Sequence, residues 1–124
     1  MNTQEVANRW LELCRQGDFK TCYQELYAPD CVSIEPQGAQ WERAEGLEEM
    51  AEKGKKWNEM LEEMHSAEVG EPVVAENFFT ARQAMDVTFK EGGRQNFEEM
   101  SLYEVRDGKI VKEQFFYTVQ NPAG

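Results

Sequence analysis

The apolar residues in the first quarter of the chain repeat at helical spacing and predict two short helices. The first stripe consists of Val6, Trp10, Leu13 and Cys14. The second stripe consists of Phe19, Cys22, Tyr23 and Leu26. Gly17-Asp18 is a stop signal after the first helix, and residues 28–30, which include a proline, end the second. Cys31–Glu35 then reads as a brief strand that Pro36 cuts off.

A third and longer stripe predicts a helix over residues 47–64. Its apolar side carries Leu47, Met50, Gly54, Trp57, Leu61 and Met64. Glu49 with Lys53, and Glu52 with Lys56, form pairs four residues apart, which we expect on the side of this helix that faces solvent.

The second half of the chain is rich in Val, Phe and Thr and predicts strands. Residues 73–90 form one long strand, Gly92-Gly93 turns the chain, and residues 95–106 and 109–119 form two more. Helices followed by antiparallel strands indicate the α+β class, with one curved sheet that packs its helices on one face.

The last hairpin has two faces whose residues follow from its loop. With a three-residue loop at 106–108, Val105 pairs with Lys109, whereas a two-residue loop would shift the pairing by one. With the longer loop, one face carries Phe97, Glu99, Ser101, Tyr103, Val111, Glu113, Phe115 and Tyr117. The other face carries Met100, Leu102, Ile110, Gln114 and Phe116. Neither face is polar, so we expect helices on one and a second subunit on the other, which makes a homodimer.

Composition and charge narrow the function classes. The 124 residues suit one domain, 1–124, and the net charge of −11 disfavours nucleic acid and anionic membranes as partners. Three cysteines without a C-x-x-C pair, and no secretory signal in the first ten residues, predict a reduced cytoplasmic protein. No P-loop, dinucleotide fingerprint, G-x-S-x-G or H-E-x-x-H string occurs, so no cofactor is expected.

Several strings resemble the nuclear transport factor 2-like superfamily, and within it the branch of SnoaL-like polyketide cyclases and ketosteroid isomerases. These strings are Arg15-Gln16-Gly17-Asp18, the segment from Leu26 to Pro36, and the segment from Tyr103 to Val111. The resemblance spans nearly the whole chain. It implies a cone-shaped fold of the cystatin-like roll type, in which a bent antiparallel sheet and three N-terminal helices enclose a pocket. It also implies that Phe79, Ala81, Gln83 and Met85 face the helices, and that Thr80, Arg82 and Asp86 face outward.

The isomerase relatives have an acidic general base just before a proline at the end of the first strand, and Glu35-Pro36 stands at the matching place. Where those relatives have a tyrosine and a protonated aspartate as oxyanion donors, this chain has Trp10 and Ser101. An indole N–H and a hydroxyl can both donate, but they do not reproduce that strong pair. A buried Glu35 would have a raised pKa that suits proton abstraction beside a carbonyl.

The candidate site collects residues from both halves of the chain. The catalytic candidates are Glu35, His65 and Ser101. The candidates for the pocket wall are Trp10, Trp57, Gln83, Glu99, Tyr103, Glu113, Phe115 and Tyr117. His65 could shuttle protons or lie at the rim, and Glu99 and Glu113 either face one pocket or are solvated. The carboxylates and His65 lack the spacing of a known metal motif, so no metal is expected.

These observations leave alternative functions open. The first is a protein that binds a small organic ligand in a semi-apolar pocket and performs isomerase, cyclase or dehydratase chemistry with Glu35 as general base. The second is a binding protein of the same fold without catalysis, and the third is a dimeric interaction module that uses the outer sheet face. The fold alone does not choose among them.

Overall fold

A computed structural model describes residues 1–119, so the last five residues of the expected domain lie outside it. The helices are α1 (Thr3–Gln16), α2 (Phe19–Leu26) and α3 (Gly46–Met60). The strands are β1 (Tyr27–Ile34), β2 (Arg43–Glu45), β3 (Leu61–Val69), β4 (Val73–Ala75), β5 (Phe78–Phe89), β6 (Gly93–Arg106) and β7 (Lys109–Phe116). The sheet has the strand order β2-β1-β7-β6-β5-β3, with β4 paired to β5.

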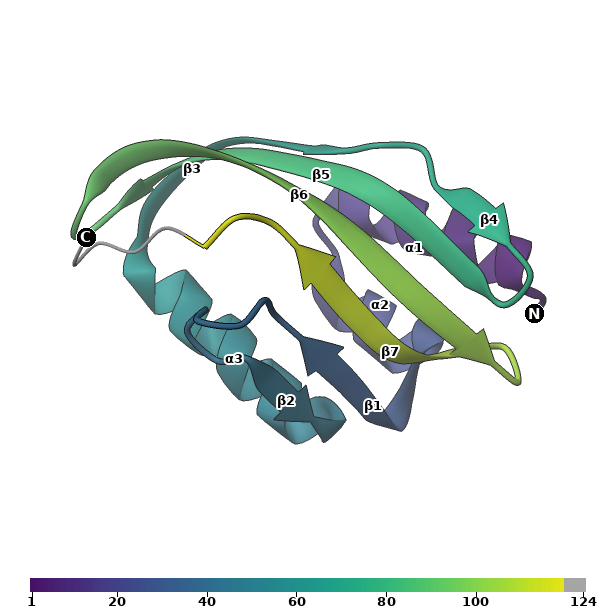
Figure 1. Ribbon diagram of the computed structural model, residues 1–124. Coiled ribbons are helices and arrows are strands. Elements are labelled where there is room, and N and C mark those ends of the chain that lie inside the picture. The colour runs from purple at the N-terminus through teal and green to yellow at the C-terminus, as the bar shows by residue number, and fades with distance from the viewer. Residues whose placement is uncertain (120–124) are drawn as a thin grey trace.

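The sheet curves around the helices, as Figure 1 shows, with α1 and α2 behind β5, β6 and β7 and with α3 beside β1 and β2. All pairs of neighbouring strands are antiparallel except β1 and β7, which are parallel. The α+β class with a curved sheet and three helices is therefore confirmed.

Local capping explains the bounds of the first two helices. Asn2 and Glu5 form a reciprocal capping box at the start of α1, and Gly17 ends it in the left-handed conformation, with φ of 72°. The Asp18 side chain then accepts a hydrogen bond from the backbone N–H of Thr21 and caps α2. Of these signals, the sequence analysis recognised Gly17-Asp18 as the end of the first helix.

The third helix is shorter than predicted, because it ends at Met60 and residues 61–69 form the edge strand β3. That strand has a largely exposed surface, and two register shifts interrupt its pairing with β5. It therefore lacks the alternation that marks a half-buried strand. The correction places His65 within a strand.

Three other boundaries differ from the prediction. Residues 28–30 belong to β1, whose pairing with β7 shifts between Tyr27 and Val32, and β2 was not predicted. The long strand at 73–90 is two strands, because Glu76 adopts a φ of 53° and turns the chain between β4 and β5.

The hairpin between β6 and β7 has a two-residue loop, Asp107-Gly108, with φ values of 50° and 75°. Val105 therefore pairs with Ile110 instead of Lys109, and Ile110 is fully buried, so its predicted outward orientation was wrong. The register shifts again at Val111, because Glu104 pairs with Lys112. This bulge restores the predicted parity, and Tyr103 pairs with Glu113 and Ser101 with Phe115.

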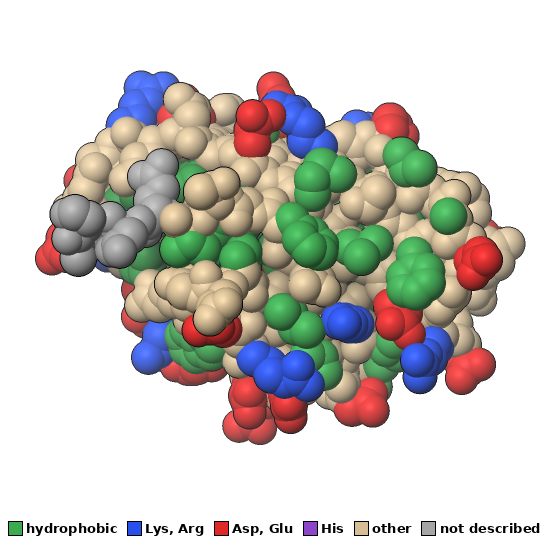
Figure 2. All heavy atoms as spheres, in the orientation of Figure 1, with side chains coloured by type: hydrophobic (Ala, Val, Ile, Leu, Met, Phe, Trp, Pro, Cys, Tyr) green, Lys and Arg blue, Asp and Glu red, His purple; other side chains and the backbone are tan. Residues whose placement is uncertain are grey.

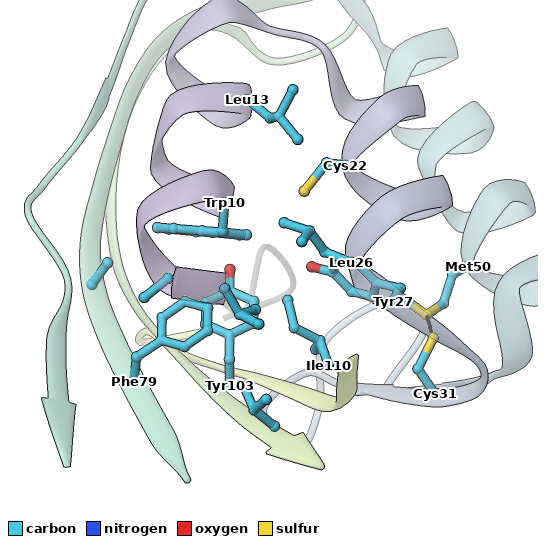
Figure 3. Close-up of a cluster of buried hydrophobic side chains, with 14 of the residues drawn as sticks. Trp10, Leu13, Cys22, Leu26, Tyr27, Cys31, Met50, Phe79, Tyr103 and Ile110 are labelled. Atoms are coloured by element: carbon cyan, nitrogen blue, oxygen red, sulfur yellow. Dashed lines mark hydrogen bonds between the residues drawn. The ribbon is translucent and has the colours of Figure 1, made fainter. Parts of the chain in front are cut away.

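The hydrophobic core lies between the inner sheet face and the first two helices. Trp10 of α1 packs on Phe79 of β5 and Tyr103 of β6, with ring centroids 5.4 and 4.9 Å away. Figure 3 shows these rings together with Leu26 and Ile110. The residues on β5 alternate as expected, with Phe79 and Ala81 buried and Arg82 exposed.

The outer face of the sheet carries exposed apolar side chains. Phe78, Met100 and Phe116 are each about 40% exposed or more. In Figure 2, hydrophobic side chains gather on the face that the sheet turns to the viewer, over β5, β6 and β7. We propose that a second copy of the chain covers this face.

Candidate functional site

A half-buried ion pair joins the end of β1 to α3. The Glu35 carboxylate contacts the Lys53 ammonium at 2.7 Å through one oxygen and accepts a 2.6 Å hydrogen bond from the Tyr117 hydroxyl through the other. Only 11% of the Glu35 side chain is exposed. The ammonium also donates to Ser33 Oγ at 3.0 Å and lies 5.3 Å from the centre of the Phe115 ring. Both oxygens of Glu35 thus have partners on the inner side of the sheet.

A second carboxylate, Glu113 on β7, is buried behind this pair. It accepts hydrogen bonds from the hydroxyls of Tyr27, at 2.6 Å, and Ser33, at 2.7 Å. Burial raises the pKa of Glu113, and the two hydroxyl donors and Lys53 oppose that shift. Ser33 links the two carboxylates, because it donates to Glu113 and accepts from Lys53.

The third carboxylate, Glu99 on β6, has a different environment. No described residue forms a hydrogen bond or ion pair with its side chain. Burial raises the pKa of Glu99 to about 7; the negative charge of Glu35 adds to the shift, and Lys53 opposes it. Glu99 therefore retains its proton to a higher pH than an ordinary glutamate does. We call Glu35, Glu99, Glu113 and Lys53 the carboxylate cluster.

A small cavity lies between this cluster and the aromatic core. Its volume is about 90 Å³. Its lining consists of Trp10, Cys14, Phe19, Cys22, Tyr23, Tyr27, Gln83, Tyr103, Glu113 and Phe115. We call it the inner cavity. Its wall is mainly aromatic. Its polar groups are the Gln83 amide, the Glu113 carboxyl, the tyrosine hydroxyls and the cysteine thiols.

Ser101 and Gln83 belong to one hydrogen-bond network beside the inner cavity. The Gln83 amide donates to Ser101 Oγ at 2.8 Å and to the Tyr103 hydroxyl at 3.3 Å. Ser101 donates in turn to the backbone carbonyl of Ala81 at 3.3 Å. The Ser101 hydroxyl proton is thus already used, and this residue positions Gln83 rather than offering a free donor.

The structure brings most of the predicted site residues to one interior, and His65 is the exception. Trp57 lies one helical turn after Lys53 on α3 and packs against Phe97, with ring centroids 6.4 Å apart. His65 instead contacts Thr88, at 2.7 Å, and Glu63, at 2.8 Å. These contacts belong to the β3–β5 edge of the sheet, away from the carboxylate cluster, because residues 61–69 form a strand.

Sequence reasoning missed Lys53, Ser33 and Tyr27. Lys53 was expected to pair with Glu49 on the solvent side of α3, but it reaches Glu35 at the end of β1. The signal was ambiguous, because a lysine four residues after a glutamate fits both a surface pair and a side chain that crosses to a neighbouring element. Ser33 was visible as an inward position, two residues before Glu35 on a strand.

Residues 1–119 show neither a metal-binding group nor a helix that could span a membrane. Residues 1–119 contain no group of three or more His, Cys, Asp or Glu side chains with the arrangement of a metal site. Among the same residues, no helix has the length and apolar character needed to span a bilayer.

Comparisons with known proteins agree with this architecture. A family model described as SnoaL-like domain matches residues 1–117. A crystal structure from Mesorhizobium loti, named for its similarity to SnoaL-like polyketide cyclases, shares 34% identity with a TM-score of 0.89, over 94% of this chain and 100% of that one. None of the functionally curated proteins matches.

Two more distant structures share the fold at lower identity. A protein of unknown function with a cystatin-like fold from Xanthomonas campestris has 18% identity and a TM-score of 0.79, over 94% of this chain and 90% of that one. TerC, co-crystallised with polyporic acid, has 16% identity and a TM-score of 0.76, over 94% and 91%. With a family model that spans almost its full length, the chain belongs to the SnoaL-like domain family.

Proposed function

We propose that this protein binds a small organic molecule that enters the inner cavity beside Glu113 and reaches the other residues of the carboxylate cluster, and that it catalyses a cofactor-independent proton transfer on it, as an isomerase, cyclase or dehydratase does. In this proposal Glu35 is the general base and Glu99 is the acid. The observation that carries it is the contrast between these neighbouring carboxylates. Glu35 is paired with Lys53, whereas burial raises the pKa of Glu99 to about 7 and none of residues 1–119 pairs with its side chain. Such divided environments separate an acid from a base.

Lys53 is the counterion of the proposed base, Glu35, and it has a role of its own in the proton transfer. When Glu35 takes a proton from carbon, its negative charge moves to the oxygen of the ligand as an enolate forms. The Lys53 ammonium then loses an anionic partner at 2.7 Å and can stabilise the new oxyanion. The residues at the oxyanion positions implied by the resemblance, Trp10 and Ser101, are replaced in this account by Lys53 and by the neutral Glu99.

The test follows proton exchange on a probe ketone. We choose cyclohexanone in D₂O, because its single ring suits the volume of the inner cavity, about 90 Å³, and its α-protons exchange measurably by NMR. The wild type should accelerate exchange, and Glu35→Gln should lower the rate about 100-fold or more, as expected for a lost general base. Glu42→Gln is the matched control, because Glu42 is exposed and lies in the same loop. Equal rates in the wild type and Glu35→Gln would reject Glu35 as the base.

A non-catalytic binding protein is the second candidate, and one observation favours it. Both oxygens of Glu35 are occupied, by Lys53 and by Tyr117, so a base would have to exchange one partner for the substrate. If cyclohexanone shifts the amide resonances of the cavity residues but its protons exchange at the uncatalysed rate, the binding function stands and the catalytic one falls. TerC, which shares the fold, was co-crystallised with polyporic acid, which supports the ligand class.

A further inference from the structure

A second hollow opens on the surface between the α1–α2 corner and β3. It has a volume of about 470 Å³ and is more open than the inner cavity. Its lining consists of Cys14, Arg15, Gln16, Gly17, Phe19, Met64, Ala67, Glu68 and Val69. We call it the groove. Its helical wall is the last turn of α1 with the first residue of α2, and its other wall is the edge strand β3.

The groove and the inner cavity share two wall residues, Cys14 and Phe19. The cavity continues from there to Glu113 and Phe115, which contact Ser33 and Lys53 respectively. The two hollows therefore adjoin at Cys14 and Phe19, so movement of these two side chains would connect the surface at β3 with the cavity wall at Glu113.

Two features indicate that the groove is preformed and partly apolar. The Arg15 guanidinium donates two hydrogen bonds to the backbone carbonyl of Val69, at 2.9 and 3.2 Å, and so fixes α1 against the end of β3. Phe19 and Met64 flank the opening on opposite walls, with 54% and 47% of their surfaces exposed. Large apolar side chains this exposed at a concave site are typical of ligand grooves.

We propose that the groove is the entrance for the ligand and holds the apolar tail of an amphipathic molecule whose compact polar ring fills the inner cavity near Glu113. This inference rests on the proposed function and adds the direction of entry and the shape of the ligand. The volumes decide where each part of the ligand lies, because the cavity of about 90 Å³ admits a single ring and the groove of about 470 Å³ admits a chain.

A homologous series of 4-alkylphenols, from methyl to pentyl, tests this arrangement by NMR titration. The affinity of the wild type should rise about two- to threefold with each CH₂, less than for complete burial because the groove is open on one side. Amide shifts should spread from cavity residues to β3 as the chain grows. Affinity that does not depend on chain length would overturn the inference but leave the proposed function intact, whereas no binding of any phenol would overturn both.

Two variants of β3 locate the effect. Ala67→Trp fills the groove, so the gain per CH₂ should disappear. Ser66→Trp is the control, because Ser66 is exposed on the same strand and does not line the groove. Tryptophan is favourable in a strand, so both variants should fold. Equal chain-length dependence in the two variants would contradict the proposal.

Thiol labelling tests the entrance without any ligand. With methyl methanethiosulfonate, the Cys14 thiolate attacks the reagent sulfur, a mixed disulfide forms and methanesulfinate leaves. Ala67→Trp should slow labelling of Cys14 about tenfold and Ser66→Trp should not, because the rate follows access. The comparison is made at the same thiol and the same pH, so it reports access to Cys14. Equal labelling of Cys14 in the two variants would reject the groove as the entrance.

Discussion

The two ends of the interior differ in chemistry although one sheet builds both. At one end Trp10, Phe79 and Tyr103 stack with at most 2% of their surfaces exposed. At the other end Glu35, Lys53 and Glu99 stand on the same inner face, partly exposed and charged or titratable. The aromatic end stabilises the fold through burial, whereas the carboxylate cluster includes a desolvated acid that costs stability. That contrast separates residues that pack the core from the residues to which we assign the proposed chemistry.

The largest expected effect is at the aromatic end. Phe79→Ala should lower the free energy of unfolding by about 3 to 5 kcal/mol, because it leaves a cavity between Trp10 and Tyr103. Phe78→Ala, one residue away on the outer face, should cost about 1 kcal/mol or less, since Phe78 is 38% exposed. Urea denaturation measures both. Similar costs for the two variants would break the distinction between the inner and outer faces.

In the carboxylate cluster, replacement of Glu99 should raise the free energy of unfolding instead of lowering it. The pKa of Glu99 is raised from 4.5 to about 7, so the folded state retains a proton that the unfolded state loses, and stability falls as the pH rises between these values. Glu99→Gln should therefore stabilise the protein on the order of 2 kcal/mol at pH 8, and little at pH 4. Urea titrations at the two pH values measure this.

Glu98→Gln is the matched control for this pH effect, because Glu98 is the exposed neighbour on the outer face. A gain in the Glu99→Gln variant that does not depend on pH would mean that desolvation of this carboxyl is not its cause.

A smaller effect is expected where the two ends meet. Tyr27→Phe removes the hydroxyl that donates to Glu113 at 2.6 Å, and leaves a buried oxygen without that partner. We expect a loss of about 1 to 2 kcal/mol in unfolding free energy. Tyr23→Phe is the control, because its ring packs on Tyr27 while its hydroxyl has no hydrogen-bond partner in residues 1–119. If both variants cost the same, the hydroxyl bond to Glu113 contributes nothing.

The smallest effect on the fold itself is expected on the outer sheet face. We propose that this face pairs two copies of the chain, because Phe78, Met100 and Phe116 form an exposed apolar surface on it. Phe116→Ser should change the stability of the monomer by about 0.5 kcal/mol or less and should convert a dimer at micromolar concentration to a monomer. Light scattering after size exclusion measures the mass. A wild type that elutes as a monomer would contradict the proposal.

The sequence predicted the fold better than the site because local signals mark elements and long-range contacts build the site. Gly17-Asp18 and the stripes of 6–26 placed α1 and α2 correctly. The strand β3 was missed because an exposed edge strand needs no alternation. The register near Ile110 was wrong because Asp107-Gly108 and Arg106-Asp107-Gly108 are both plausible loops, and only the bulge at Val111 reconciles the shorter loop with the inward position of Glu113.

In the candidate site, too, the residues set by local signals were predicted and those set by long-range contacts were missed. Glu99, Glu113, Tyr103 and Phe115 were placed on the inner face by strand alternation, which is a local property. Lys53 was not, because its partner lies 18 residues away and the choice between Glu49 and Glu35 depends on how α3 packs against β1. Glu35 was named for its place before a proline, and that place alone does not reveal its two partners.

The central claim is that Glu99 and Glu35 form a divided acid–base pair, and a carbon-detected NMR titration of the glutamate side chains tests it most directly. The account predicts that the Glu99 carboxyl titrates near pH 7, well above the exposed glutamates. It also predicts that Glu35→Gln lowers that midpoint, because a neighbouring negative charge is removed, and that Glu98→Gln leaves it unchanged. A Glu99 carboxyl that titrates together with the exposed glutamates, or one whose midpoint does not respond to Glu35→Gln, would contradict the claim.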